Sequence, residues 1–263
     1  MVAAARRLAW RRAGLATSGA LVLAGAVLVA EVWLAINREY LPTEPPLVID
    51  QLVAPARAAG GLAPLELVVL GDSTTAGVGS PSAAQSLPVL VARQVADRSG
   101  RAVHVVGHGV SGARTDTVRS EQVPRVLDEG VDVVLVVVGS NDVTHLTPWW
   151  QMQTRTAALL DAARERSGAP VVLGGIPQFR TVPALLQPLR TLTGAYAVPL
   201  RRAQRAAVAA AGEGVSFVDI AALASPRFLG VPESMSSDGF HPSEIGYGFW
   251  ADALAPAVAE AAG

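Results

Sequence analysis

From residue 65 to the C-terminus, short runs of valine, leucine and isoleucine alternate with longer amphipathic stretches. The apolar runs are continuous and do not alternate with polar residues, which indicates strands covered on both faces. Such strands with helices between them predict a three-layer α/β/α sandwich with a mainly parallel sheet. We expect five strands, at residues 65–70, 103–106, 131–138, 171–173 and 215–220, and helices at 84–98, 115–128, 154–166, 196–211 and 243–262.

Length and composition allow one domain of catalytic size. The chain has 263 residues, of which 51% are hydrophobic and 16% charged, enough for one sizeable core. From Glu39 onward, 16 arginines and 21 acidic residues give a net charge of −5, so this part lacks the basic surface typical of nucleic-acid-binding proteins. The chain contains no cysteine, which excludes disulfides and thiolate metal sites.

The first 37 residues differ from the rest. Four arginines, at positions 6, 7, 11 and 12, precede 18 uncharged residues at 13–30, and apolar residues continue from Val32 to Ile36. This length suits a helix that crosses a bilayer, which needs about 20 apolar residues. The arginines predict a cytoplasmic N-terminus and place the rest of the chain outside. Residues 1–37 are therefore interpreted as an uncleaved signal anchor, with a cleaved signal peptide as the alternative.

Residues 38–63 are interpreted as a linker. They show no sustained hydrophobic period and contain four prolines and two adjacent glycines. The chain then divides into an N-terminal transmembrane anchor at 1–37, this linker, and a catalytic-size domain at 64–263.

Small and polar residues follow three of the predicted strands, and a fourth polar motif lies near the C-terminus. The four motifs are GDST, GHGVSGART, GSNDVTHLTPWW and SSDGFHPSE. In parallel α/β sheets the carboxyl ends of the strands carry the chemistry, so these motifs are candidates for one site. Asp238 and His241 are three positions apart, a spacing that puts two side chains on one side of a turn. Together the motifs supply a hydroxyl, an imidazole, a carboxylate and potential oxyanion donors.

These motifs resemble the four blocks of the SGNH hydrolases, also called the GDSL esterase and lipase family. Residues 71–73 (GDS) resemble the nucleophile block and 110–113 (VSGA) the glycine block. Residues 139–142 (GSND) resemble the asparagine block and 238–242 (DGFHP) the aspartate–histidine block. The resemblance extends from residue 65 to the C-terminus, with the blocks in the right order, and implies that family's flavodoxin-like fold.

Two positions depart from the family's pattern. Thr74 stands in place of the leucine of GDSL, and Gly107 stands where many relatives have an asparagine. Neither position is required for the chemistry, so the departures affect only the expected substrate preference.

The resemblance implies roles for five residues. Ser73 attacks an ester carbonyl after His241 removes its proton, and Asp238 orients the imidazole. The backbone N–H groups of Ser73 and Gly112, with the side-chain amide of Asn141, form the oxyanion hole. No cofactor is implied. No metal is expected either, because the other histidines (104, 108 and 145) lack paired ligand spacing.

Each assignment has a structural alternative. Ser73 could cap a helix, and Gly112 could serve only as a turn glycine. Asn141 could form an Asx turn with Asp142 as the helix cap, and His241 could be an ordinary surface histidine. Ser111 is a competing nucleophile, but its GVSG sequence lacks the G-x-S-x-G spacing of the α/β-hydrolases.

Two further features lie near the motifs. Trp149 and Trp150 follow the asparagine block, where they either line a substrate pocket or pack beneath a loop. Residues 177–200 contain four prolines and look like an insertion beside the site that could act as a lid.

The function expected from these residues is a serine esterase that uses an acyl-enzyme on Ser73, with the domain on the extracytoplasmic side of the cell membrane. A cleaved N-terminal segment would make it a secreted protein. The substrate would be a small-molecule, lipid or glycan ester. One alternative is an acyltransferase or deacetylase acting on cell-envelope glycans, and another is a non-catalytic envelope-binding module. The sequence leaves the oligomeric state open.

Overall fold

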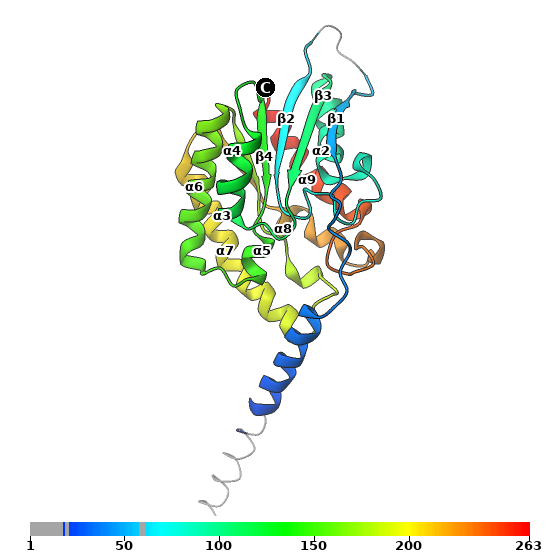
Figure 1. Cartoon of the computed structure of the whole chain (residues 1–263), viewed down its shortest axis with the longest axis vertical. Coiled ribbons are helices and arrows are strands. Elements are labelled where there is room, and N and C mark those ends of the chain that lie inside the picture. The colour runs from blue at the N-terminus through cyan, green and yellow to red at the C-terminus, as the bar shows by residue number, and fades with distance from the viewer. Residues whose placement is uncertain (1–17, 19–20, 58–61) are drawn as a thin grey trace, which may run out of the picture.

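The structure, a computed structural model, describes residues 18, 21–57 and 62–263 (Figure 1). A six-stranded sheet forms its centre, in the strand order β1-β3-β2-β4-β5-β6. All neighbouring strands are parallel except β1, which runs antiparallel to β3. The strands are β1 (Ile49–Val53), β2 (Leu65–Gly71), β3 (Val103–Gly109), β4 (Val133–Val137), β5 (Val171–Gly174) and β6 (Val215–Val218).

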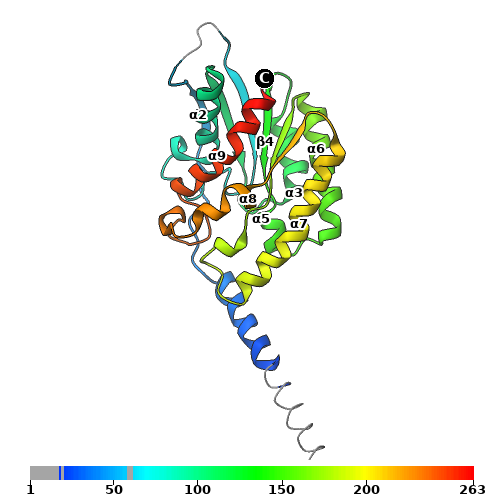
Figure 2. The same cartoon turned by 180° about the vertical axis from the view of Figure 1, so that it is seen from behind.

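Helices cover both faces of this sheet (Figures 1 and 2). The α-helices are α2 (Leu87–Ser99), α3 (Thr115–Thr117), α4 (Val123–Val126), α5 (Ser140–Thr144), α6 (Trp149–Ser167), α7 (Leu189–Ala211), α8 (Ile220–Leu223) and α9 (Glu244–Ala261). A π-helical turn (Val118–Gln122) joins α3 to α4, and 3₁₀ turns lie at Ala83–Gln85, Phe179–Thr181, Ser225–Phe228 and Pro232–Ser234. This confirms the predicted α/β/α sandwich.

The alternation of side chains along β2 shows how the two layers are built. Leu67 and Val69 belong to a core cluster shared with α2 and α9, whereas Val68 and Leu70 belong to a cluster shared with α4, α6 and α7. Successive strand residues point to opposite faces, so a run that is apolar throughout is needed to fill both layers. The continuous apolar runs in the sequence follow from this requirement.

The sheet has one strand more than the five expected. Strand β1 lies within residues 38–63, which the sequence suggested were a linker, and it pairs Ile49 with Gly107. A Cβ atom at position 107 would lie 2.9 Å from Cγ2 of Ile49 and 3.1 Å from Cγ of Pro88. The glycine at 107 therefore makes room for β1, which gives this departure from the family's pattern a structural reason.

Only part of the predicted anchor is described. Residues 1–17 and 19–20 lie outside the described residues, and residues 21–36 form a helix. Within the described part of the chain, no helix has the length and apolar character needed to cross a membrane. The helix at 21–36 contacts the domain: the carboxylate of Glu31 is buried and accepts a hydrogen bond of 2.7 Å from the backbone N–H of Leu189.

His104 lies between two carboxylates where β1, β2 and β3 meet. Its Nε2 is 2.8 Å from Oδ1 of Asp50 on β1, and its Nδ1 is 2.6 Å from Oε2 of Glu66 on β2. Hydrogen bonds with Asp50 and then Glu66 raise the pKa of His104 above its ordinary value of 6.5. The protonated imidazole therefore ties the edge strand to the sheet.

We predict that this contact stabilises the domain in a pH-dependent way. Because the folded pKa is raised, the contribution is complete below about pH 6.5, the unfolded value, and is lost as the pH rises through the folded value. His104→Gln should lower the free energy of unfolding near pH 5.5 by up to about 1 kcal/mol, since the pair is partly exposed, and by less near pH 9. Urea unfolding at both pH values measures this difference. An equal loss at the two pH values would contradict the role of the imidazolium.

Candidate active site

The nucleophile candidate lies on a tight turn at the end of β2. The backbone N–H of Ala76 donates to the carbonyl oxygen of Asp72 at 3.0 Å, and Oδ1 of Asp72 accepts from the backbone N–H and the hydroxyl of Thr74. The chain then continues through turns, so Ser73 does not cap a helix. The turn is buried, and burial raises the pKa of Asp72.

The side chain of Gln122 holds the carboxyl end of β2 in place. Gln122 accepts from the backbone N–H of Gly71 at 3.0 Å and donates to its carbonyl oxygen at 2.7 Å. A buried amide that satisfies both backbone groups of one residue holds the strand end in a single position. The sequence did not point to Gln122, because it lies 51 residues from Gly71 along the chain.

Ser73, His241 and Asp238 form one hydrogen-bonded series. The distance from Oγ of Ser73 to Nε2 of His241 is 3.0 Å, and Nδ1 of His241 is 2.7 Å from Oδ2 of Asp238. All three side chains are buried, with exposed fractions of 8% for Ser73, 6% for His241 and 4% for Asp238. The structure therefore brings the three predicted catalytic residues together in the order that nucleophilic catalysis requires.

The carboxylate of Asp238 stays ionised despite its burial. Burial alone would raise its pKa, but hydrogen bonds from the His241 side chain and from the backbone N–H groups of Phe240 and His241 outweigh burial and lower the pKa to about 2. An ionised carboxylate keeps the proton on Nδ1 of His241 and leaves Nε2 free to accept the serine proton.

A segment outside the predicted domain also contacts the triad. The backbone N–H of Leu41 donates to Oδ2 of Asp238 at 3.3 Å. Beside it, the ring of Tyr40 packs edge-on against Phe240, with ring centroids 5.4 Å apart, and Phe240 packs against His241 in the same way at 5.1 Å. No pattern in the sequence pointed to this contact, because Leu41 lies 197 residues before Asp238 in a segment without periodicity.

The predicted oxyanion donors are Ser73 itself, Gly112 on the loop after β3 and Asn141 inside α5. Nδ2 of Asn141 donates to the carbonyl oxygen of Ala113 at 3.1 Å, which leaves its second hydrogen for a ligand. Gly112 has φ of 81°, the left-handed region that favours glycine. In the part of the chain that the structure describes, the backbone N–H groups of Ser73 and Gly112 donate no hydrogen bond. Three donors are therefore available for an oxyanion.

Asp142 joins α5 to the loop of Gly112. It is fully buried inside α5, where its Oδ2 accepts from the backbone N–H and the hydroxyl of Thr115 at 2.9 and 2.8 Å, and its Oδ1 accepts from the hydroxyl of Thr147. The cap of α5 is Gly139, so Asp142 is not the helix cap considered above. By fixing Thr115 it holds the loop of Gly112 against the helix of Asn141, a role that position alone did not reveal.

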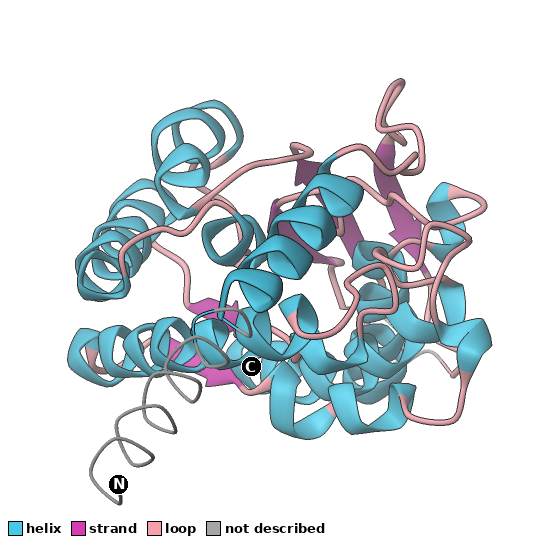
Figure 3. Cartoon of the chain, turned by 90° about the horizontal axis from the view of Figure 1, so that it is seen from below, coloured by secondary structure: helices cyan, strands magenta, loops and turns pink. Residues whose placement is uncertain are grey.

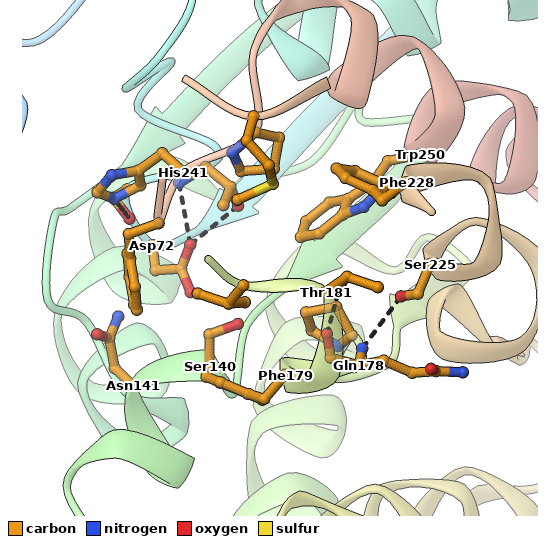
Figure 4. Close-up of a pocket in the computed structure, with 17 residues that line it drawn as sticks. Asp72, Ser140, Asn141, Gln178, Phe179, Thr181, Ser225, Phe228, His241 and Trp250 are labelled. Atoms are coloured by element: carbon orange, nitrogen blue, oxygen red, sulfur yellow. Dashed lines mark hydrogen bonds between the residues drawn. The ribbon is translucent and has the colours of Figure 1, made fainter. Parts of the chain in front are cut away.

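A cavity opens beside the triad (Figure 4). His241 and Asn141 lie on one side of it, and Phe228 and Trp250 lie on the opposite side. The segment that the sequence suggested could act as a lid also lines it, through Pro177, Gln178, Phe179, Thr181 and Val182. An apolar wall opposite a nucleophile suits the acyl or alcohol part of an ester.

The remaining candidates lie elsewhere. Trp149 and Trp150 do not line this cavity and are 51% and 65% exposed. The hydroxyl of Ser111 is buried and makes no hydrogen bond to any described residue, whereas Ser73 faces an imidazole. The described residues contain no group of three or more histidine, aspartate or glutamate side chains that could hold a metal ion.

Known proteins resemble this chain in sequence and in fold. Residues 69–249 match the GDSL-like Lipase/Acylhydrolase family. The chain is 35% identical to the GDSL-like esterase Rv1075c of Mycobacterium tuberculosis, over 94% of this chain and 82% of the relative. Among solved structures, TesA superposes with a TM-score of 0.58 at 26% identity, over 73% of this chain and 96% of TesA. The lipase Lip_vut3 from a goat rumen metagenome has the same TM-score at 20% identity, over 73% of this chain and 97% of its own.

The contact between Leu41 and Asp238 generates a prediction. Leu41→Pro removes the N–H donor, whereas Leu41→Ala keeps it and serves as the matched control. One hydrogen bond contributes about 0.5–1.5 kcal/mol, so the proline variant should lower kcat for a soluble ester by roughly 2–10-fold. The alanine variant should stay close to the wild type. Steady-state kinetics together with thermal unfolding test this, and an equal fall in both variants would show that only the side chain matters.

Proposed function

The chain belongs to the GDSL-like lipase and acylhydrolase family, and we propose that it is a serine esterase that hydrolyses carboxylic esters through an acyl-enzyme on Ser73. The observation that carries this proposal is the hydrogen-bonded series from Ser73 through His241 to Asp238. Membership in the family implies a serine hydrolase. The geometry supports Ser73 as the nucleophile, His241 as the base and Asp238 as the orienting carboxylate.

Acylation begins when Oγ of Ser73 attacks the ester carbonyl carbon and its proton passes to Nε2 of His241. The imidazolium that forms is stabilised by the carboxylate of Asp238, which lies 2.7 Å from Nδ1. The carbonyl oxygen becomes an oxyanion and accepts hydrogen bonds from the N–H groups of Ser73 and Gly112 and from Nδ2 of Asn141.

Collapse of this intermediate breaks the bond to the alcohol oxygen, and the imidazolium gives that oxygen its proton as it leaves. A water molecule then repeats the sequence on the acyl-enzyme: His241 accepts the water proton, the hydroxide attacks the acyl carbon, and the proton returns to Ser73. The products are an alcohol and a carboxylic acid, and the residues return to their starting state.

Hydrolysis and transfer to a sugar hydroxyl use the same five residues and differ only in which acceptor reaches the acyl-enzyme. The apolar wall of Phe228 and Trp250 favours substrates with a hydrophobic part. A non-catalytic binding module would have no need for a serine hydroxyl within hydrogen-bonding distance of an imidazole. The contact between Ser73 and His241 therefore argues against that alternative.

The proposal includes a location. An unbroken uncharged run at 13–30, preceded by four arginines, supports an N-terminal anchor with the domain on the extracytoplasmic side. The described helix at 21–36 presents exposed apolar side chains along its length, among them Leu21, Val22 and Val29. Side chains of this kind suit contact with lipid.

The nucleophile is tested by Ser73→Ala, which should abolish hydrolysis of a short activated ester and labelling by a fluorophosphonate. Ser111→Ala is the matched control, because Ser111 lies on a neighbouring loop without a base, and it should keep both activities. Mass spectrometry of the labelled protein identifies the modified peptide. If Ser73→Ala still hydrolysed the ester and Ser111→Ala did not, the nucleophile would be Ser111.

The oxyanion hole is tested at Asn141. Its amide stabilises charge that exists only in the transition state, so Asn141→Ala should lower kcat by about 10²–10³-fold, roughly 2.7–4 kcal/mol, with a much smaller change in KM. Asn141→Asp should be at least as damaging, because a carboxylate repels the oxyanion. The thermal midpoint of each variant is the control. If the alanine variant folded with lower stability but kept a near-normal kcat, Asn141 would be a turn residue and not an oxyanion donor.

A further inference from the structure

The active-site end of the domain carries exposed apolar side chains on neighbouring elements. We name five of them the apolar rim: Leu146, Trp149, Trp150, Leu186 and Leu192, with exposed fractions of 68%, 51%, 65%, 47% and 49%. They lie after α5, at the start of α6 and around the start of α7. The hydroxyl of Tyr196 on α7 donates to the carbonyl oxygen of Thr147 at 2.8 Å, which ties the loop before α6 to α7.

The N-terminal helix leaves the domain at this same end (Figures 1, 2 and 3). Glu31, the first charged residue after the uncharged run at 13–30, bonds directly to the backbone N–H of Leu189 at the start of α7. Ala35 packs against a cluster that also includes Leu185 and Leu189. The helix is therefore fixed to the domain at the first turn of α7.

The distance between the helix and the triad is limited by the chain. The helix ends at Ile36, and Leu41, five residues later, donates to Asp238. Five residues span at most about 18 Å. The cavity wall is continuous with the helix contact, because Phe179 and Val182 belong to the same cluster as Ala35.

From these observations we propose that the apolar rim rests on the surface of the lipid bilayer and that the substrates of Ser73 are esters carried by lipids in that bilayer. This rests on the proposed esterase function and on the N-terminal anchor. In this proposal the uncharged run at 13–30 lies in the bilayer and Glu31 lies at the bilayer surface. The contact between Glu31 and Leu189 then places the start of α7 at the same surface. Leu192 lies one helical turn further along, at about 1.5 Å of rise per residue.

The chemistry of the rim fits lipid. Tryptophan has a large apolar ring and a polar N–H, a combination enriched where membrane meets water. Two adjacent tryptophans and three leucines around the exit of an apolar helix match a bilayer surface.

The absence of cysteine allows a direct test with the full chain in phosphatidylcholine vesicles. Single cysteines are introduced as Trp150→Cys and Leu192→Cys on the rim, and as Glu260→Cys near the C-terminus at the opposite end (Figure 1). Each carries a nitroxide whose collisions with oxygen, concentrated in lipid, and with a water-soluble nickel complex are measured. The rim labels should favour oxygen and the Glu260 label nickel. The proposal would be overturned if the rim labels were as accessible to nickel as the control label. It would also be overturned if contact between two copies of the chain broadened the spectra of the rim labels.

A kinetic test addresses the substrate. Leu186→Ser with Leu192→Ser should lower kcat/KM for a vesicle-borne ester about tenfold relative to a soluble ester with the same acyl group, because the rim loses apolar contact. Leu52→Ser is the control, since Leu52 is 65% exposed on β1 opposite His104, at the far end of β3. Equal losses on both esters would overturn the inference. If the wild type hydrolysed the soluble ester but the nitroxide labels placed the rim in water, only the contact between the rim and the bilayer would be contradicted. Failure on every ester contradicts the esterase proposal.

Discussion

The buried carboxylate of Asp238 is the interaction on which the rest of the site depends. Four donors surround it: the imidazole of His241 and the backbone N–H groups of Phe240, His241 and Leu41. Without them a buried carboxylate would take up a proton and lose its hold on the imidazole. The hydrogen bonds from His241 and Phe240 outweigh burial and lower its pKa to about 2, so the carboxylate holds His241 toward Ser73 over the whole neutral range.

These donors come from both ends of the chain, so the catalytic domain and the N-terminal segment work as one unit. Leu41 reaches the triad, and Glu31 reaches the start of α7. Asp142 fixes the loop of Gly112 to α5, and these two parts carry two of the oxyanion donors. The sheet supplies only the edge at which these parts meet, and side chains far apart in the sequence set the final geometry.

The sequence predicted the parts of the structure that depend on local pattern. Strands β2 to β6 were found because burial on both faces requires continuous apolar runs. The positions of the motifs after strands or within one turn made them candidates for one site, and the resemblance to a family supplied the roles of the three triad residues. Strand β1 was missed because IDQLV buries only part of its surface at a sheet edge and lies among prolines. Leu41, Gln122 and Asp142 were missed because each acts through a contact distant in sequence, which no periodicity encodes.

The most direct test of the central claim is the acyl-enzyme itself. The full chain is mixed rapidly with excess activated ester, the release of alcohol is followed, and the quenched protein is digested for mass spectrometry. The account predicts a burst of alcohol equal to the concentration of active sites, with one acyl group on the peptide that contains Ser73. A burst with the acyl group on another residue, or turnover without any acylated peptide even when deacylation is slowed by a bulky acyl group, would contradict it.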